Sequence, residues 1–453
     1  MFASIHRLRG RILEFRRSRD GNVLVMFAMV LPAMLLSVLA LVDYSRAATQ
    51  RLELQNSLDS ATLYAARSTA TTETELTAIG MRVLRANLQG SGVSLGAVSF
   101  RMDANQRVYG SAQALVPVTA PGIIGVSQVT IGSTSEVARS SNNVEVAIAL
   151  DVTGSMRGTP LADMKSAAKE LVDLIVKDVQ TPHYTKVALV PYSNAVNVGS
   201  IANSVRGTLT AGRCDTPGCQ RYRFYNANNE RITYDASTCV TERTGSDAYT
   251  DVAPTSPTTR VGQHYIGAQS GDSNLCIASQ IVPLSTNRAS LKASIDAYSA
   301  EGSTAGQIGL AWAWYMVSPN FASLFPASSQ AAAYNSRDLL KVVILMTDGE
   351  FNTAHANGVL SRDSGFGSDA IQINQNATNG SAHNQALTLC GRIKSSGVIL
   401  YTVGFNLNSN NARNLMRDCA TSATHAYLPN GGVALSDAFR AIGQEINSLR
   451  IAR

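Results

Sequence analysis

The sequence lacks the short motifs that mark several common enzyme classes. No P-loop or Cys-His signature occurs in the 453 residues, so the usual signs of nucleotide-binding enzymes and thiol catalysts are missing. No two cysteines are spaced as C-x-x-C, and the histidines near them lack ligand spacing, which disfavours a zinc site. The basic residues behind the net charge of +6 are spread along the chain except for one early cluster, so no nucleic-acid partner is expected.

Charge is also absent from residues 22–42, "NVLVMFAMVLPAMLLSVLALV", which are about as long as the roughly 20 residues that a bilayer-spanning helix needs. A cleaved signal peptide is the alternative, although the apolar run is long for one and no clean small-x-small site follows it. The segment before it, residues 1–21, carries a cluster of arginines: Arg7, Arg9, Arg11, Arg16, Arg17 and Arg19. The positive-inside rule therefore predicts a cytoplasmic basic head at 1–21, a single transmembrane helix at 22–42 and an exported, extracytoplasmic bulk.

The cysteines agree with an exported chain. There are six, all beyond the apolar segment, and an even number is expected of disulfides in an oxidising compartment. Six cysteines allow 15 connectivities. Proximity along the chain favours Cys214–Cys219, Cys239–Cys276 and Cys390–Cys419.

Residues 43–141 are expected to form a small helix-plus-strand stalk domain. Leu54, Leu58, Ala61 and Ala65 recur at helical spacing, and Thr72 with Glu75 forms a capping box for a second helix. Between 93 and 138, alternating polar and apolar residues broken by Gly and Pro predict antiparallel strands.

From residue 142 onward, strand and helix patterns alternate. Apolar runs such as "VEVAIAL" and "LLKVVILM" are typical of strands that are buried on both faces of a parallel sheet. Residues 142–453 are therefore predicted to be an α/β domain with a doubly wound, mostly parallel sheet. An insertion at about 200–285 is polar, contains four cysteines and is interpreted as a disulfide-stapled loop region.

Two of the predicted strands end in carboxylates. Asp151 ends the first, followed by Thr153 and Ser155, and Asp348 ends another in "VVILMTDGE". Ligands bind outside the carboxyl ends of strands in open α/β sheets, and two carboxylates there would repel each other without a cation between them. Oxygen ligands suit a hard ion such as Mg²⁺, which commonly keeps an open or water-filled position. A carboxylate from a protein partner could occupy that position.

These residues resemble a known family. "DVTGS" is similar to the D-x-S/T-x-S signature of the metal-ion-dependent adhesion site in von Willebrand factor type A domains. "TDG" resembles the second acidic motif of that family, and "EGSTAGQIGLAWAW" its threonine loop. The resemblance implies a Mg²⁺ or Mn²⁺ site whose direct or water-mediated ligands are Asp151, Thr153, Ser155, Thr304 and Asp348. Thr153 stands where Ser is commoner, and Ser303 could compete with Thr304.

The amino-terminal segment resembles TadG-like proteins of the tight-adherence (Tad/Flp) pilus system. In that family an anchor precedes a pattern that is matched here by Leu54, Gln55, Ser57, Asp59, Ala61, Leu63 and Ala66. The resemblance implies a non-enzymatic envelope protein that is anchored in the bacterial inner membrane by a single span, has its bulk in the periplasm and assists assembly or anchoring of adhesive pili. Its partner would be a pilus or envelope component that supplies an acidic residue.

Two other functions compete with this hypothesis. One is a surface-exposed adhesin that binds a host or matrix ligand directly. The other is a metal-dependent hydrolase, for which His383 and His425 are candidate bases, although neither lies in a catalytic motif. Tyr222, Tyr225 and Tyr234 of the insertion are expected to be exposed interface residues. Trp312 and Trp314 follow the Thr304 loop on a predicted helix, and at least one is expected to pack on the sheet.

Overall fold

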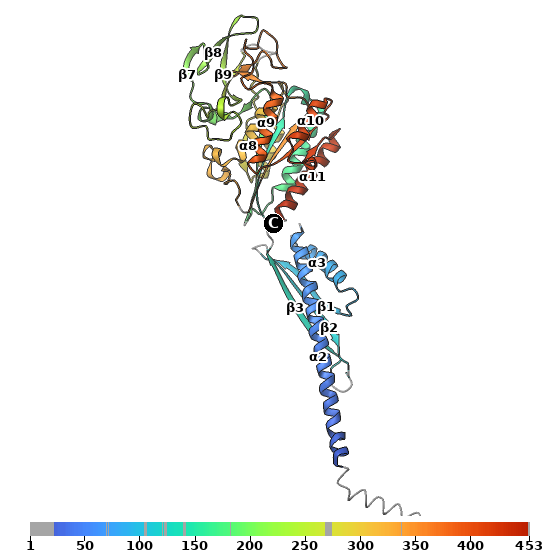
Figure 1. Ribbon diagram of the computed structural model, residues 1–453. Coiled ribbons are helices and arrows are strands. Elements are labelled where there is room, and N and C mark those ends of the chain that lie inside the picture. Colours follow the sequence, from blue (N-terminus) through green and yellow to red (C-terminus); the bar gives the residue numbers. More distant parts are fainter. Residues whose placement is uncertain are drawn as a thin grey trace, which may run out of the picture. The chain divides into compact units, whose positions relative to one another are not determined.

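The computed structural model describes residues 22–451 except 69, 71, 104–106, 120, 122–124, 139–141, 182, 268–273 and 337. The predicted basic head lies outside the described residues. The chain divides into two compact units, Met1–Arg139 and Ser140–Arg453, and each is described by itself (Figure 1).

The first unit is built on a single long helix, α2 (Asn22–Arg67), with Pro32 inside it. The amino-terminal part of α2 is exposed and is long and apolar enough to cross a membrane. Its carboxyl-terminal part is amphipathic as predicted, because Leu54, Leu58, Ala61 and Ala65 are all fully buried. The expected change from anchor to packed helix therefore occurs within one continuous helix.

The buried stripe of α2 packs on α3 (Glu73–Asn87) and on an antiparallel sheet of order β1-β2-β3. The strands are β1 (Ser94–Met102), β2 (Arg107–Pro117) and β3 (Gln128–Ala138). Thr72 caps α3, as predicted, and its hydroxyl accepts a hydrogen bond from Glu75 N at 3.3 Å. Gly110 lets the sheet approach the helix, since a Cβ there would lie 2.3 Å from Thr62 Oγ1.

The second unit is organised around a six-stranded sheet of order β11-β5-β4-β12-β15-β16. The strands are β4 (Asn143–Asp151), β5 (Thr185–Tyr192), β11 (Val282–Ser285), β12 (Leu339–Thr347), β15 (Ile399–Gly404) and β16 (Ala426–Tyr427). All neighbouring pairs are parallel except β11 with β5. The apolar runs of the sequence are therefore strands of one mixed, mostly parallel sheet.

Helices cover both faces of this sheet. One face packs on α8 (Gly306–Val317), α9 (Ala382–Ser395) and α10 (Asn410–Cys419), and the other on α5 (Thr159–Ile175), α7 (Arg288–Asp296) and α11 (Gly432–Ile451). Strand β4 contributes small residues, Ala147 and Ala149, to the first face and large ones, Ile148 and Leu150, to the second. The small residues leave room for the bulky helix α8, whose Trp312 belongs to the same cluster.

The region predicted as an inserted loop is largely folded. It forms a second sheet of order β10-β9-β8-β7, with β6 paired to β9. The elements are β6 (Val196–Asn197), α6 (Ala202–Arg206), β7 (Thr210–Cys214), β8 (Cys219–Tyr225), β9 (Arg231–Thr241) and β10 (Gly262–Ile266). A hairpin of β13 (His355–Ala356) and β14 (Val359–Leu360) packs against it. Alternation in "RYRFY" and "RITYDASTCV" fits these strands.

All three expected disulfides are present. Cys214–Cys219 joins β7 to β8, Cys239–Cys276 joins β9 to the segment after β10, and Cys390–Cys419 joins α9 to α10. The pairing of nearest cysteines along the chain is confirmed.

Candidate functional site: carboxylates at two strand ends

The candidate site lies where two central, adjacent strands end. Strands β4 and β12 are parallel and in register, with Leu150 opposite Met346. The helix after β4 covers one face of the sheet and the helix after β12 covers the other. This divergence makes a topological switch point, the place at which open α/β sheets bind ligands.

Asp151 is fully buried at the end of β4. Its Oδ1 accepts a hydrogen bond from Thr153 N at 2.9 Å, and its Oδ2 accepts one from Thr347 Oγ1 at 2.8 Å. Burial raises the pKa of Asp151 above its usual value, although these hydrogen bonds act in the opposite direction. The carboxylate is thus held firmly in a place that disfavours its charge.

Asp348 follows β12 and completes a chain of oxygen atoms. Its Oδ1 accepts from Ser155 Oγ at 2.7 Å, and Ser155 Oγ lies 3.0 Å from Thr153 Oγ1. Burial, and then the charge of Asp151, raise the pKa of Asp348 to about 6. Four predicted ligands therefore belong to one hydrogen-bonded group that carries two mutually repelling carboxylates.

The fifth predicted ligand, Thr304, lies in the loop before α8. Hydrogen bonds join this loop to the loop after β4 that carries Thr153 and Ser155. Glu301 N donates to Val152 O at 2.9 Å, and Gly154 N donates to Gly302 O at 2.9 Å. Gly302 has a φ of +77°, and a Cβ there would lie 2.1 Å from Asn194 Oδ1. A glycine is required at this close approach.

Ser303 and Thr304 differ in what their hydroxyls face. Ser303 is buried and its Oγ accepts a hydrogen bond from Thr353 Oγ1 at 2.6 Å. Thr304 lines, together with Ser155, a cleft of about 520 Å³ beside the strand ends. The geometry therefore favours Thr304 over Ser303 as the residue that faces a ligand.

Two residues that sequence reasoning missed hold this loop. Asn352 Oδ1 accepts from Thr304 N at 3.0 Å, and both Asn352 N and Thr353 N donate to Thr304 O. Thr353 Oγ1 also lies 2.9 Å from Asn352 Oδ1. They follow Asp348 by four and five residues in an irregular loop, and no spacing rule in the sequence marks them.

Several candidates from the sequence lie elsewhere. His383 is in α9 and His425 precedes β16, and neither is among the described residues that line the cleft. Trp312 and Trp314 are both buried in the core, as expected of at least one of them.

The prediction for the insertion tyrosines was wrong in part. Tyr222 and Tyr234 are buried with Phe224 in an aromatic cluster, whereas Tyr225 is 54% exposed. These tyrosines lie on paired strands rather than on a loop, so alternate side chains point inward.

Comparison with known proteins begins at the amino terminus. Residues 21–68 match the sequence-family model described as "Putative Flp pilus-assembly TadE/G-like". This match covers the whole of α2 and leaves both the rest of the first unit and the second unit unmatched. No curated protein sequence matches the chain.

The solved structures that match the chain include pilus proteins. The von Willebrand factor domain of the type V pili tip protein Mfa5 from Porphyromonas gingivalis is 14% identical with a TM-score of 0.38, and the match covers 69% of this chain and 97% of that one. For the adhesive tip pilin GBS104 from Group B Streptococcus agalactiae the identity is 12%, the TM-score 0.37 and the coverage 67% and 99%. The pilus adhesin SpaC from Lactobacillus rhamnosus GG is 12% identical with a TM-score of 0.38 and coverage of 78% and 34%, so this chain spans about a third of it.

Proposed function

We propose that residues 142–453 form a von Willebrand factor type A domain with a doubly wound sheet, whose adhesion site binds Mg²⁺ or Mn²⁺. The proposed ligands, direct or through water, are Asp151, Thr153, Ser155, Thr304 and Asp348. The observation that carries the proposal is the pairing of two carboxylates of raised pKa with hydroxyls at the ends of adjacent parallel strands. Because every donor is an oxygen atom, the set fits a hard divalent cation. The strand order supports the fold assignment.

The bound ion would supply a positive centre with an open position for an acidic side chain of a protein partner. The five ligand residues would hold the ion beside the cleft. Asn352 would keep Thr304 in place by accepting a hydrogen bond from its backbone N–H, and Thr353 by donating one to the neighbouring Ser303. We assign the domain a non-enzymatic role, in which the ion holds an acidic side chain of the partner and no bond is broken. Neither histidine considered as a catalytic base, His383 or His425, is among the described residues of the cleft.

We further infer that the chain is a single-pass protein of a bacterial inner membrane that assists assembly or anchoring of Tad/Flp pili. The family match at residues 21–68 and the exposed apolar part of α2 support this role. The amino terminus would be cytoplasmic and the second unit periplasmic, where its disulfides could persist. A pilus or envelope protein would supply the acidic residue.

Calorimetric titration of the full chain in detergent with Mg²⁺ and Mn²⁺ tests the metal site. We expect saturable binding that Asp151→Asn abolishes and that Asp418→Asn leaves unchanged, because Asp418 is exposed on α10, away from the cleft. Equal binding by both variants would contradict the assigned site.

Piliation of cells that express the same variants tests the cellular role. Asp151→Asn should reduce surface pili to the level of a deletion strain, whereas Asp418→Asn should restore them. Normal piliation in the deletion strain would refute the assembly role. Access of added protease to the second unit on intact cells would favour the surface-exposed adhesin instead.

A further inference from the structure

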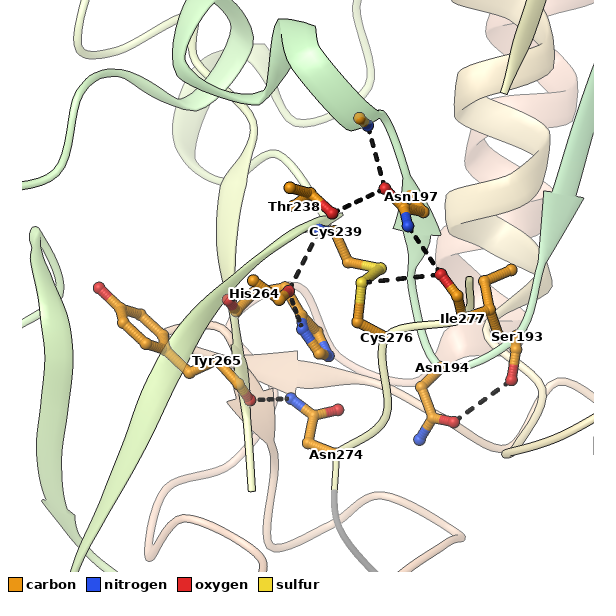
Figure 2. Close-up of a disulfide and its surroundings, with 12 residues drawn as sticks. Ser193, Asn194, Asn197, Thr238, Cys239, His264, Tyr265, Asn274, Cys276 and Ile277 are labelled. Carbon is orange, nitrogen blue, oxygen red and sulfur yellow. Dashed lines mark hydrogen bonds between the residues drawn. A yellow bond between two sulfur atoms is a disulfide. The ribbon is translucent and has the colours of Figure 1, made fainter. Parts of the chain in front are cut away.

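The insertion contains a second cluster of side chains with metal-binding chemistry. Sulfur atoms of Cys239 and Cys276 and a ring nitrogen of His264 lie within 4.8 Å of one another. Figure 2 shows His264 beside the disulfide that joins the two cysteines. Among the described residues, this is a group of three His, Cys, Asp or Glu side chains whose ligand atoms lie close enough together to hold one metal ion.

A strand irregularity brings His264 to this position. The pairing of β10 with β9 steps from Gln263 opposite Val240 to Tyr265 opposite Ala236. The β9 strand therefore has extra residues opposite His264, in the stretch that contains Cys239. Such bulges re-aim side chains, and here the result is a histidine beside a cysteine from the neighbouring strand.

Ser237 contacts the Nδ1 side of the His264 ring. Ser237 Oγ lies 2.8 Å from His264 Nδ1. The same hydroxyl oxygen accepts a hydrogen bond from Cys239 N at 3.1 Å, and it can donate one to His264 O at 3.4 Å. If the hydroxyl donates to that carbonyl, Nδ1 carries the ring proton and Nε2 presents a lone pair. Nε2 is buried. Burial, and then the charge of His355, lower the pKa of His264 to about 3, although a side-chain contact with Asn274 raises it, so the ring is neutral.

We propose that the thiolates of Cys239 and Cys276 and the Nε2 atom of His264 bind one Zn²⁺ ion when the disulfide between the cysteines is reduced. Tetrahedral zinc bonds of about 2.0–2.3 Å place neighbouring ligand atoms roughly 3.3–3.8 Å apart. The three ligand atoms now lie within 4.8 Å of one another, and breaking the disulfide frees the two sulfur atoms to move apart to that spacing. The Nδ1 contact with Ser237 matches the second-shell contacts that orient metal-binding histidines. A water molecule would take the fourth position.

Disulfide and zinc exclude each other in this scheme. A dithiol reductant attacks the sulfur of Cys276, which is partly exposed, and Cys239, which is buried, is the leaving thiolate. The second thiol of the reductant then releases Cys276 and closes the reductant's own disulfide, so two electrons and two protons pass to the cysteines. Zinc binding displaces those two protons. Oxidation by a partner disulfide reverses both steps and releases the ion.

The ligand chemistry separates this site from the one at the strand ends. Thiolate and imidazole select zinc, whereas carboxylate and hydroxyl oxygens select Mg²⁺ or Mn²⁺. The inference therefore stands whether or not the proposed adhesion site binds its cation, and its test uses Co²⁺ and Zn²⁺ instead of Mg²⁺.

The experiment uses the full chain in detergent, without oxygen, either oxidised or reduced by a phosphine. Co²⁺ is the probe because its absorption reports tetrahedral thiolate coordination, and Zn²⁺ should displace it. Because the oxygen ligands at the strand ends can also take Co²⁺, only the tetrahedral thiolate absorption is counted, and we expect one such Co²⁺ per reduced chain and none per oxidised chain. His264→Gln should weaken binding at least tenfold, and His383→Gln, on α9, should leave it unchanged.

Cysteine alkylation mapped by mass spectrometry adds a residue-resolved measurement, since the phosphine also opens the other two disulfides. Zn²⁺ should protect Cys239 and Cys276 from alkylation but leave Cys214 and Cys219 reactive. Equal protection of both pairs, tetrahedral Co²⁺ absorption from the oxidised chain, or unchanged affinity for this Co²⁺ in His264→Gln would overturn the proposal. So would loss of all binding because the unit unfolds on reduction.

Discussion

Replacing Asp348 by asparagine should stabilise the metal-free protein. The folded unit raises the pKa of Asp348 from about 3.8 to about 6 through burial and the charge of Asp151. Between these two pH values the folded state binds more protons than the unfolded chain, so the free energy of unfolding falls as pH rises through this window. Above pH 6 the native chain has lost all of the free energy of unfolding that this pKa shift removes. Asparagine has no charge, so the variant does not lose it.

The size of the effect follows from the shift. A change of about two pKa units corresponds to about 3 kcal/mol, and because Asp348 is partly exposed we expect about 1–3 kcal/mol. In the Asp348→Asn variant the amide oxygen can still accept the hydrogen bond from Ser155, so the loss of charge is the main change. At pH 7.5 without divalent ions, the variant should therefore melt a few degrees higher than the native chain, and at pH 3.5 the difference should vanish.

Tryptophan fluorescence is the appropriate assay. The chain has two tryptophans, and both Trp312 and Trp314 are buried in α8 of the second unit, so the signal reports that unit alone. Addition of Mg²⁺ should raise the melting temperature of the native chain and leave Asp348→Asn unchanged. A variant that is less stable than the native chain at pH 7.5 would refute the idea that the two carboxylates repel each other in the absence of a cation.

Two other substitutions and a pH titration test the core and the candidate site. Lys341→Met should lower the free energy of unfolding by about 3–5 kcal/mol in urea, because it leaves Glu145, 2.5 Å from the ammonium group, buried without its counter-charge; unchanged stability would contradict this. Gly302→Ala should weaken Mg²⁺ binding at least tenfold by calorimetry, since the new methyl group would displace the loop that carries Thr304; native affinity would show that the loop adapts. Mg²⁺ affinity should fall as pH is lowered through 6, where the strand-end carboxylates take up protons; a flat profile would point to other ligands.

The sequence predicts the second unit well where burial dominates. Strands β4 and β12 are almost wholly apolar because both faces of the sheet are covered, and such runs are easily recognised. The sequence does not reveal strand β11 (Val282–Ser285), because this strand is short and pairs antiparallel at the edge of the sheet. The strands of the insertion are equally hard to recognise, because they are polar and bury a small aromatic cluster rather than a continuous apolar face.

The candidate site can also be predicted from the sequence only in part. Asp151 and Asp348 can be brought together from the sequence alone, because adjacent parallel strands end at one edge. The choice between Ser303 and Thr304 depends on Thr353, which is 50 residues away along the chain and meets Ser303 only through loop packing. Local spacing holds no information about that contact.

The same loop packing links the two parts of the second unit. Gln307, on the first turn of α8, donates to Glu242 Oε1 at 2.9 Å and to Thr353 O at 2.7 Å. Glu242 follows β9 of the insertion and lies, buried, 3.0 Å from His355 Nδ1. A continuous set of buried polar contacts thus joins the insertion to the residue that holds the Thr304 loop. Because an unpaired group in such a network is costly, a change in how the insertion is packed would be felt at the strand ends, so the insertion and the candidate site should be treated as one cooperative unit.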